Sequence, residues 1–448
     1  MNPLNEKRVV ITGLGPLTAI GIGKEDLWNS ILQRRTNVVH HTALLDGKPW
    51  TTFPIAKVSQ FDIAEFKLSK AAMNFLQQRE LMEDTDLLYL IAAIQLALRD
   101  SNINYSREEN DIGLVLTHEN PGVDRYVKEV FQVLMDFAEG KIPQVADKKE
   151  LAEMCYYHQR KAVYNMQSFM YLHHVSKVFG FHGFSLFVNN ACASGLYAIE
   201  AASQQIRSGR SNVMVVAGAD QPLFATKYLW FRDLGLYAED GVMRPFDRNR
   251  KGFVFGDGGG ALILEELEHA LKRGATLYGE YLGGGFNQEA WKVSVPLVTG
   301  NFYTKAFESA LQYSGIKAEE IDLVNPHGVA TGVADRIEAR TIHQIFGRGD
   351  PSRIGQDSRP YISAFKPYVG HNLGGSSLVE LIILLLSMQN NLIPPTLNTE
   401  EVDPELEIDL CRGNWPVAPT KEIQIVAKMS SGFAGYNAVG IFKKVNEK

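Results

Sequence analysis

The chain has 448 residues, of which 45 % are hydrophobic and 21 % are charged, a composition that excludes a very small domain and a disordered or fibrous protein. Its 45 Lys and Arg residues against 51 Asp and Glu residues give a net charge of −6, so no general basic field is available to hold a phosphate backbone. We therefore expect a soluble folded protein that has no nucleic-acid partner.

Short β-branched runs alternate with longer amphipathic runs along the chain, a pattern typical of helices packed on sheets in an α/β fold. The β-branched runs predict strands at 8–12, 112–116, 184–188, 213–217 and 261–264, and then at 276–282, 321–324, 361–364, 423–427 and 438–442. Apolar residues recur every three or four positions in the predicted helices, which are 86–100, 195–209, 302–313, 333–345 and 377–389. The chain is thus two successive α/β halves.

A charged stretch at 264–274 separates the two halves. We place the boundary there and predict a first domain at 1–267 and a second at 268–448. A segment at about 120–170 breaks the alternation, because its apolar residues stand at helical spacing within one long stretch: Tyr126, Val130, Phe131, Leu134 and Phe137. This segment is a lid, a subunit contact or an extra helix that covers the core.

Neither the N-terminal residues nor the most apolar run of the chain predicts a membrane segment. Residues 1–15 lack the apolar core of a signal peptide, and the most apolar run, 378–386, is interrupted by Glu380 and is too short to cross a bilayer. The three cysteines, Cys155, Cys192 and Cys411, are too few for a disulfide framework and indicate a reducing compartment. We expect a cytoplasmic protein with no membrane span.

Two glycine clusters could suggest a nucleotide cofactor, but neither has the required pattern. Gly13 and Gly15 follow a predicted strand, yet Thr18 occupies the third glycine position of a dinucleotide fingerprint, and 255–260 has no Gly-Lys-Ser/Thr ending. The close pair of Cys155 and His158 has no second pair of ligands nearby. We therefore predict no bound cofactor and no metal.

Cys192 stands between an apolar strand and the predicted helix that begins near Gly195. A thiol at this place meets the unpaired amides and the positive end of a helix, which favour the thiolate, and its small neighbours leave room for a substrate carbonyl. Most cysteines are small buried hydrophobes, but this setting favours a nucleophile. We leave Cys155 and Cys411 as structural residues.

Two histidines follow predicted strands of the second half. His327 lies after the strand at 321–324, and His371 lies after the strand at 361–364, each next to a glycine that permits a tight turn. Strand ends are where α/β proteins assemble their sites. Taken singly, each could be an ordinary hydrogen-bonded histidine.

Together these residues resemble the motifs of the β-ketoacyl-acyl carrier protein synthases, the type II condensing enzymes. Three motifs carry the resemblance and stand in the family's order: 191–195 around Cys192, 326–335 around His327, and 366–371 with Lys366 and His371. Shorter matches at 8–15, 244–247, 252–254 and 432–437 extend it over nearly the whole chain. The resemblance implies the thiolase-like fold, in which two pseudo-duplicated α/β halves form a layered αβαβα core.

The resemblance also implies an activity, the decarboxylative Claisen condensation of a Cys-bound acyl group with malonyl carrier protein, in fatty-acid, specialised lipid, polyene or polyketide synthesis. Cys192 would accept the acyl group from a carrier phosphopantetheine thioester. His327 and His371 would donate hydrogen bonds to the malonyl thioester carbonyl while carbon dioxide leaves. The implied partners are an acyl carrier protein and its acyl and malonyl thioesters, and a second copy of the chain in a homodimer, with a heterodimer as the other arrangement.

Supporting residues follow from the same resemblance. Lys366 would supply a fixed positive charge held by Glu338, with Asp335 beside it in the motif. The backbone amides of Cys192 and Phe433 would form the oxyanion hole.

The resemblance also implies a contact with the pantetheine arm and a gating loop. Thr331 would contact the pantetheine arm, where the family has a second threonine at the position of Val329. Phe433 would lie in a gating loop with Gly432 and Gly435. In that loop Ala434 replaces a glycine and narrows the allowed backbone.

Two other functions stay open. A thiolase-fold acyltransferase would load an acyl group on Cys192 without elongating it, although the two histidines of an enolate site argue against this. A chain-length partner subunit of a ketosynthase heterodimer would need no nucleophile, so the presence of Cys192 argues against that function as well.

Overall fold

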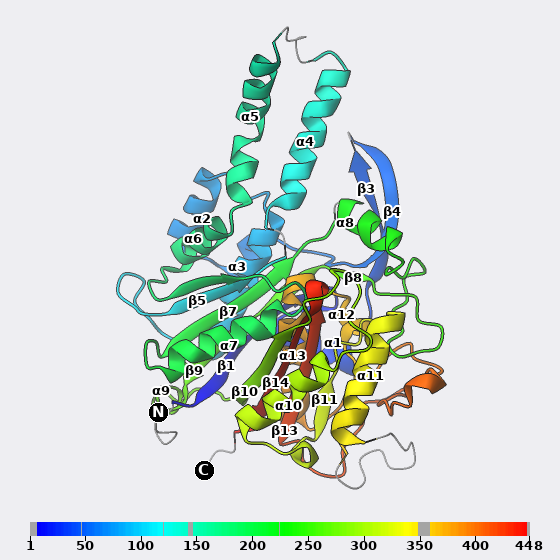
Figure 1. The fold of residues 1–448 in the computed structure, drawn as a ribbon. Helices are drawn as coiled ribbons and strands as arrows, with labels where there is room; N and C mark the ends of the chain where they lie inside the picture. Colours follow the sequence, from blue (N-terminus) through cyan, green and yellow to red (C-terminus); the bar gives the residue numbers. More distant parts are fainter. Residues whose placement is uncertain are drawn as a thin grey trace.

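One mixed sheet runs through both halves of the chain (Figure 1). The computed structural model describes residues 7–45, 47–119, 121–141, 147–223, 225–347 and 359–445. Within these residues the sheet has 11 strands, in the order β12-β11-β13-β14-β10-β1-β9-β7-β5-β6, with β2 (Gly21–Ile22) paired to β1 off this path. The remaining strands are β1 (Val9–Thr18), β5 (Gly113–Thr117), β6 (Ser185–Val188), β7 (Val213–Asp220), β9 (Gly258–Glu266), β10 (Gly279–Gln288), β11 (Leu323–Asn325), β12 (Tyr361–Ile362), β13 (Ile425–Gly432) and β14 (Tyr436–Lys443).

The pairing of these strands shows that the two halves repeat one topology. In the first half β1 pairs antiparallel with β9, β9 antiparallel with β7, and β7 parallel with β5, which pairs parallel with β6. In the second half β10, β14, β13, β11 and β12 follow with the same directions in the same order. The halves join where β1 pairs antiparallel with β10. The predicted α/β fold of two pseudo-duplicated halves is confirmed.

Helices cover the sheet on both faces and lie between the two halves. The long apolar helix α3 (Thr85–Ser101) packs on β1, β9 and β7, and α10 (Phe302–Ser314) packs on β10 and β14, beside α11 (Gly332–Phe346). The helices α7 (Ser194–Arg207) and α13 (Ser376–Asn390) contact each other and strands of both halves. These two helices begin at the motifs of Cys192 and His371, so the fold brings both motifs to the middle of the molecule.

Leu373–Asn390 is long and apolar enough to cross a membrane, but 89 % of these 18 residues are buried inside the protein. The chain from Ser376 to Met388 is buried throughout, against the sheet and α7. Its apolar character therefore serves the core.

The predicted strands and helices are all present, with ends that differ by a few residues at most positions. The largest differences are in β10, which starts at Gly279 and continues to Gln288 because it pairs along its length with β14, and in β1, which continues to Thr18 because it pairs that far with β9. Not predicted were the hairpin β3 (Val38–Leu45) and β4 (Lys48–Ala56), which with β8 (Phe255–Gly256) forms a three-stranded sheet. Further helices are α1 (Lys24–Leu32), α2 (Lys70–Gln78), α6 (Ser168–Phe179), α8 (Ala225–Asp233), α9 (Leu267–Lys272), α12 (Lys366–Val369) and short 3₁₀ turns at Ile63–Phe66, Ala318–Glu320, Leu373–Gly375, Pro404–Leu406 and Phe433–Gly435.

The atypical segment forms two helices, α4 (Val123–Ala138) and α5 (Lys148–Asn165), which lie side by side and project away from the sheet (Figure 1). The predicted helical spacing is confirmed for α4. No residue of α4 or α5 whose side chain is described is buried, so the expectation that this segment covers the core is wrong. Phe131 of α4 contacts Trp50 of the β4 strand, with ring centroids 5.7 Å apart. A lid or a subunit contact remains the prediction; the segment's first residue, Asn120, lies outside the described residues.

We propose 267/268 as the boundary between the two halves. The last strand of the first half, β9, ends at Glu266, and the first strand of the second half, β10, begins at Gly279. Only α9 lies between them.

Candidate active site

Cys192 lies in the tight turn that joins β6 to α7. Ala191 adopts a positive φ of 49°, and the Ser194 hydroxyl closes the turn by accepting from the Asn190 amide at 2.7 Å. A side chain at Gly195 would come within 2.5 Å of the Ser377 hydroxyl at the start of α13. The glycine therefore allows the two central helices to approach closely next to the sulfur.

The Cys192 thiol is buried, with 8 % of the residue exposed. Burial and the neighbouring Glu119 carboxylate raise the thiol pKa well above its usual value, and the Lys366 ammonium lowers it by a smaller amount. Burial and Glu119 therefore oppose the thiolate that the helix N-terminus is expected to favour. The Glu119 Oε1 lies 4.0 Å from Sγ.

His327 follows β11, and hydrogen bonds to its backbone amide and carbonyl fix its position. Glu338 accepts from the His327 amide at 2.6 Å and from the Gly328 amide at 2.7 Å. The Lys366 ammonium donates to the His327 carbonyl at 2.6 Å and lies 3.2 Å from the ring Nδ1. An ammonium carries no acceptor, so Nδ1 accepts and the proton of the neutral ring is on Nε2.

His371 lies in the turn between α12 and α13, with its ring 5.5 Å from the His327 ring. The Leu373 amide donates to His371 Nδ1 at 3.2 Å, which again leaves the proton on Nε2. Burial, with Lys366 as the next cause, holds the pKa of both imidazoles well below the usual value. The site therefore offers two neutral imidazoles, each with an Nε2–H donor.

A buried charge cluster of Lys366, Glu380 and Lys428 lies next to His327. Lys366 forms an ion pair with Glu380, whose other oxygen accepts from Lys428 at 2.8 Å. All three residues are at most 1 % exposed. The expectation that Glu338 holds Lys366 is wrong, since the partner is Glu380, while Glu338 caps the two amides at His327.

The predicted gating loop closes the site at the end of β13. A side chain at Gly432 would lie 3.1 Å from the Cys192 amide nitrogen, so the loop backbone adjoins the nucleophile turn. Phe433 packs on Phe231, with ring centroids 5.2 Å apart. Ala434 adopts a φ of 62° and Gly435 a φ of 79°, so the alanine occupies a backbone conformation that glycine adopts more easily.

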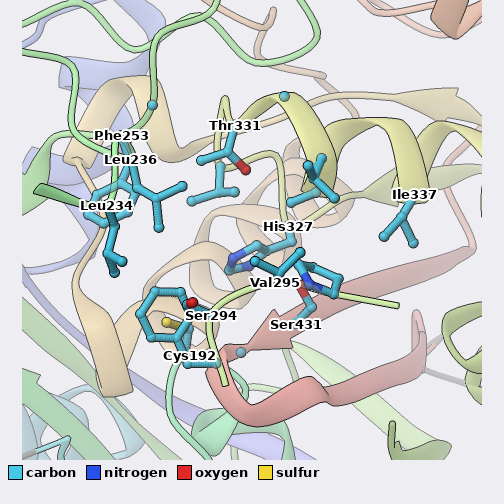
Figure 2. A pocket seen from close by; sticks show the side chains of 18 of the residues that line it. Cys192, Leu234, Leu236, Phe253, Ser294, Val295, His327, Thr331, Ile337 and Ser431 are labelled. Carbon is cyan, nitrogen blue, oxygen red and sulfur yellow. The ribbon is translucent and has the colours of Figure 1, made fainter. Parts of the chain in front are cut away.

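These elements enclose a pocket of about 420 Å³ (Figure 2). Figure 2 shows Leu234, Leu236 and Phe253 together as one wall of the pocket, with the buried residues Cys192 and His327 beside them. The predicted residues that line the pocket are Cys192, His327, His371, Val329, Thr331, Gly432, Phe433 and Gly435. Lys366, Glu338 and Asp335 are outside the lining.

Thr331, Val329 and Asp335 belong to the start of α11. Thr331 precedes the first residue of the helix and faces the pocket, as does Val329. Asp335 is fully buried and accepts from the Phe246 amide at 2.6 Å. Burial raises the pKa of Asp335 to about 8. Asp335 does not line the pocket, and its hydrogen bond to the Phe246 amide supports the geometry of the loop.

Three functional candidates were missed from the sequence. Glu380 and Lys428 are single charges in otherwise apolar elements, and a charge in a core element needs a partner, so their pairing was detectable in principle. Glu119 follows the strand β5, whose parallel neighbour β6 leads to Cys192. The order of the strands, which the sequence does not state, is what makes Glu119 a site residue.

Comparison with known proteins gives concordant results. The family model "Beta-ketoacyl synthase, N-terminal domain" matches residues 6–270, and "Beta-ketoacyl synthase, C-terminal domain" matches residues 278–400. The chain is 30 % identical over 449 residues to "3-oxoacyl-[acyl-carrier-protein] synthase 2" of Synechocystis sp. (strain ATCC 27184 / PCC 6803 / Kazusa), covering 99 % of this chain and 100 % of that protein.

Two solved structures are similar over nearly the whole chain. "The ishigamide ketosynthase/chain length factor" has a TM-score of 0.81 at 25 % identity, and a beta-ketoacyl synthase from Burkholderia phymatum STM815 has a TM-score of 0.80 at 26 % identity. Each comparison covers 98 % of this chain and 100 % of the other.

Proposed function

The chain belongs to the β-ketoacyl synthase family, and on that premise we propose that Cys192, His327 and His371 carry its reaction. It is a condensing enzyme that transfers acyl groups, and we propose that it works in fatty-acid or polyketide synthesis. The observation that carries the assignment of residues is the convergence of one thiol and two Nε2–H donors on a single pocket.

In the first step Cys192 takes the acyl group. Its sulfur attacks the thioester carbonyl of an acyl carrier protein, and the carbon–sulfur bond to the phosphopantetheine breaks. We assign the oxyanion hole to the backbone amides of Cys192 and Phe433, which the close approach of Gly432 to the nucleophile turn supports. The apolar wall of Leu234, Leu236 and Phe253 suits an alkyl or pantetheine chain.

In the second step a malonyl thioester occupies the same pocket. The Nε2–H groups of His327 and His371 donate to its carbonyl oxygen as carbon dioxide leaves, so the negative charge of the enolate meets two donors. The enolate carbon then attacks the acyl carbonyl on Cys192, a carbon–carbon bond forms and the bond to sulfur breaks. No proton is removed from carbon, which is why neutral imidazoles suit the step better than a general base.

The phosphopantetheine arm enters with the carrier protein, and the reaction of the described residues calls for no resident cofactor. Thr331 at the start of α11 is our candidate for the hydroxyl that contacts this arm, because it lines the pocket. We place the enzyme in the cytoplasm, since Cys155, Cys192 and Cys411 are all unpaired.

We propose that two copies pair through β6. This strand is the end of the sheet and pairs only with β5 among the described strands, so its other edge is open to a second chain. The same strand leads to Cys192, which would place both nucleophiles near the interface. A heterodimer with a related chain-length subunit is the other arrangement, and light scattering of the purified chain distinguishes them.

Release of carbon dioxide tests the function against an acyltransferase without elongation. Acyl-loaded enzyme is mixed with malonyl carrier protein labelled in the free carboxyl group, and released label is counted. We expect release that matches the amount of acyl-enzyme consumed. Loaded enzyme that releases no label, with the acyl group passed to an oxygen or nitrogen acceptor, would contradict the proposal.

A further inference from the structure

The thiol proton of Cys192 finds no acceptor in His327, His371 or Lys366. The Nδ1 atoms of His327 and His371 already accept from Lys366 and Leu373, and their Nε2 atoms carry protons. Lys366 is itself a donor. Because the thiol pKa is raised well above the usual value, loading requires a group that takes this proton.

Glu119 is the acceptor in contact with the sulfur. Its Oε1 lies 4.0 Å from Cys192 Sγ, within the range for a hydrogen bond to sulfur. From this contact we propose that Glu119 is a catalytic residue, the general base that removes the Cys192 proton during acyl loading and returns it to the departing pantetheine thiolate. This inference rests on the proposed function, since it concerns the loading step.

The fold fixes Glu119 at this position. Strands β5 and β6 are parallel neighbours, with Thr117 opposite Val188, so the chain leaves both strands at the same edge of the sheet. The Asn189 side chain donates to the Glu119 carbonyl at 2.8 Å and ties the two exits together. On the other side, a side chain at Gly374 would lie 3.1 Å from the Glu119 amide nitrogen, so the turn after His371 packs on this backbone.

The charges around Glu119 suit a base that works near neutral pH. Burial raises its pKa to about 7, with Asp220 of β7 adding to the rise, while Lys227 of α8 and the adjacent His118 lower it. Lys227 Nζ lies 3.6 Å from Asp220 Oδ1, and His118 lies 3.3 Å from the same oxygen. His118 also lies 3.4 Å from Asp86 of α3. Glu119 is thus backed by a buried ionic cluster and is not an isolated carboxylate.

In the proposed step the proton of Cys192 passes through Glu119 to the leaving thiolate. The S–H bond of Cys192 breaks as its proton moves to the Glu119 carboxylate, and the sulfur forms a bond to the acyl carbonyl carbon. The carbon–sulfur bond to the pantetheine breaks, and the leaving thiolate takes the proton from the Glu119 carboxylic acid. Glu119 returns to the carboxylate, with no other co-reactant.

The test compares two reactions of the same sulfur in the wild type and in Glu119→Gln. The first is single-turnover acylation by an acyl carrier thioester, followed by intact-protein mass. The second is alkylation of Cys192 by iodoacetamide, which needs the thiolate but no proton for a departing pantetheine thiolate. Glu119→Asp tests partial rescue, and Asp257→Asn is the matched control, because Asp257 is a buried carboxyl with a pKa also raised to about 7 whose side chain bonds Val58 and Tyr89.

We expect the two reactions to move in opposite directions. Loss of the base slows acylation by about 10²-fold or more in Glu119→Gln, whereas loss of the negative charge lowers the thiol pKa and speeds alkylation. Wild-type acylation rises with pH through about 7 as Glu119 ionises, and this inflection disappears in the variant. Asp257→Asn keeps wild-type rates in both reactions.

Two results would overturn the inference. Acylation of Glu119→Gln at the wild-type rate would show that the carboxylate is not the base, and an equal slowing of both reactions would show that it only shapes the site. A wild type that takes no acyl group while Cys192 still alkylates would overturn the proposed function together with this inference.

Discussion

Lys366 is bonded to His327 at two atoms, the backbone carbonyl at 2.6 Å and the ring Nδ1 at 3.2 Å. One buried ammonium thereby fixes the position and the tautomer of the imidazole, and burial together with this ammonium keeps the ring neutral. The second imidazole reaches the same tautomer by a different route, since His371 Nδ1 accepts from a backbone amide. The pair of Nε2–H donors is a property of the fold and is present before substrate arrives.

Removing one donor should separate loading from condensation. We expect His371→Ala to take the acyl group at the wild-type rate and to lose about 10²-fold or more in condensation, because the enolate loses one of its two donors. His371→Gln should retain more condensation than His371→Ala, since its side-chain amide can place an N–H near the position of Nε2. Acylation and condensation are measured separately by intact mass. Equal losses in both steps for His371→Ala would contradict the assigned role.

Breaking the buried cluster of Lys366, Glu380 and Lys428 should lower the free energy of unfolding. Glu380 is the carboxylate between Lys366 and Lys428, and burial lowers the pKa of Lys428 to about 8 even with this partner. We expect Glu380→Gln to lower the free energy of unfolding by about 3–5 kcal/mol, since two buried cations lose their counter-charge. Urea unfolding measures the loss.

A surface pair provides the control for that variant. Glu422 is 54 % exposed at its side chain and pairs with Lys444, so Glu422→Gln should leave the midpoint of urea unfolding nearly unchanged. Similar effects of the two glutamate substitutions would show that burial of the cluster is not what makes it costly.

Buried carboxyls should make the protein less stable as the pH rises. Burial raises the pKa of Asp257 to about 7 from an unfolded value of about 3.9, so the folded state holds a proton that the unfolded state has lost. Stability is therefore lost between these two pH values, because the unfolded state gives up its proton there while the folded state keeps it. The stability of Asp257→Asn relative to the wild type should improve by about 3 kcal/mol between pH values of about 5 and about 7.5. A constant difference, measured by urea unfolding at the two pH values, would contradict this.

The sequence predicts the two halves well because each core strand is a short β-branched run bounded by turn residues, as at Val213 and Ile425. The β3–β4 hairpin was missed because its third strand is the distant two-residue β8, a partner that only the folded chain brings near. The position of the atypical segment was predicted from the sequence. Its direction away from the sheet was not, because the spacing of apolar residues along a helix does not show what the helix packs against.

In the candidate site, motif residues were easier to predict than their partners. Cys192, His327 and His371 each follow a strand next to small residues, and all three line the pocket. Glu380 was interpreted only as an interruption of an apolar run, and Glu338 was predicted in its place as the partner of Lys366. Both errors arise because the partner in an ion pair depends on how the helices pack. The raised thiol pKa was missed because it comes from burial in the fold and from Glu119, which follows β5 and is 73 residues away in sequence.

Intact-protein mass tests the central claim most directly. Wild type and Cys192→Ala are incubated with a panel of acyl carrier thioesters, and malonyl carrier protein is then added. The account predicts an acyl adduct on the wild type alone, which disappears on malonyl addition as a product two carbons longer forms. An adduct that persists after malonyl addition, or an adduct of equal yield on Cys192→Ala, would contradict it.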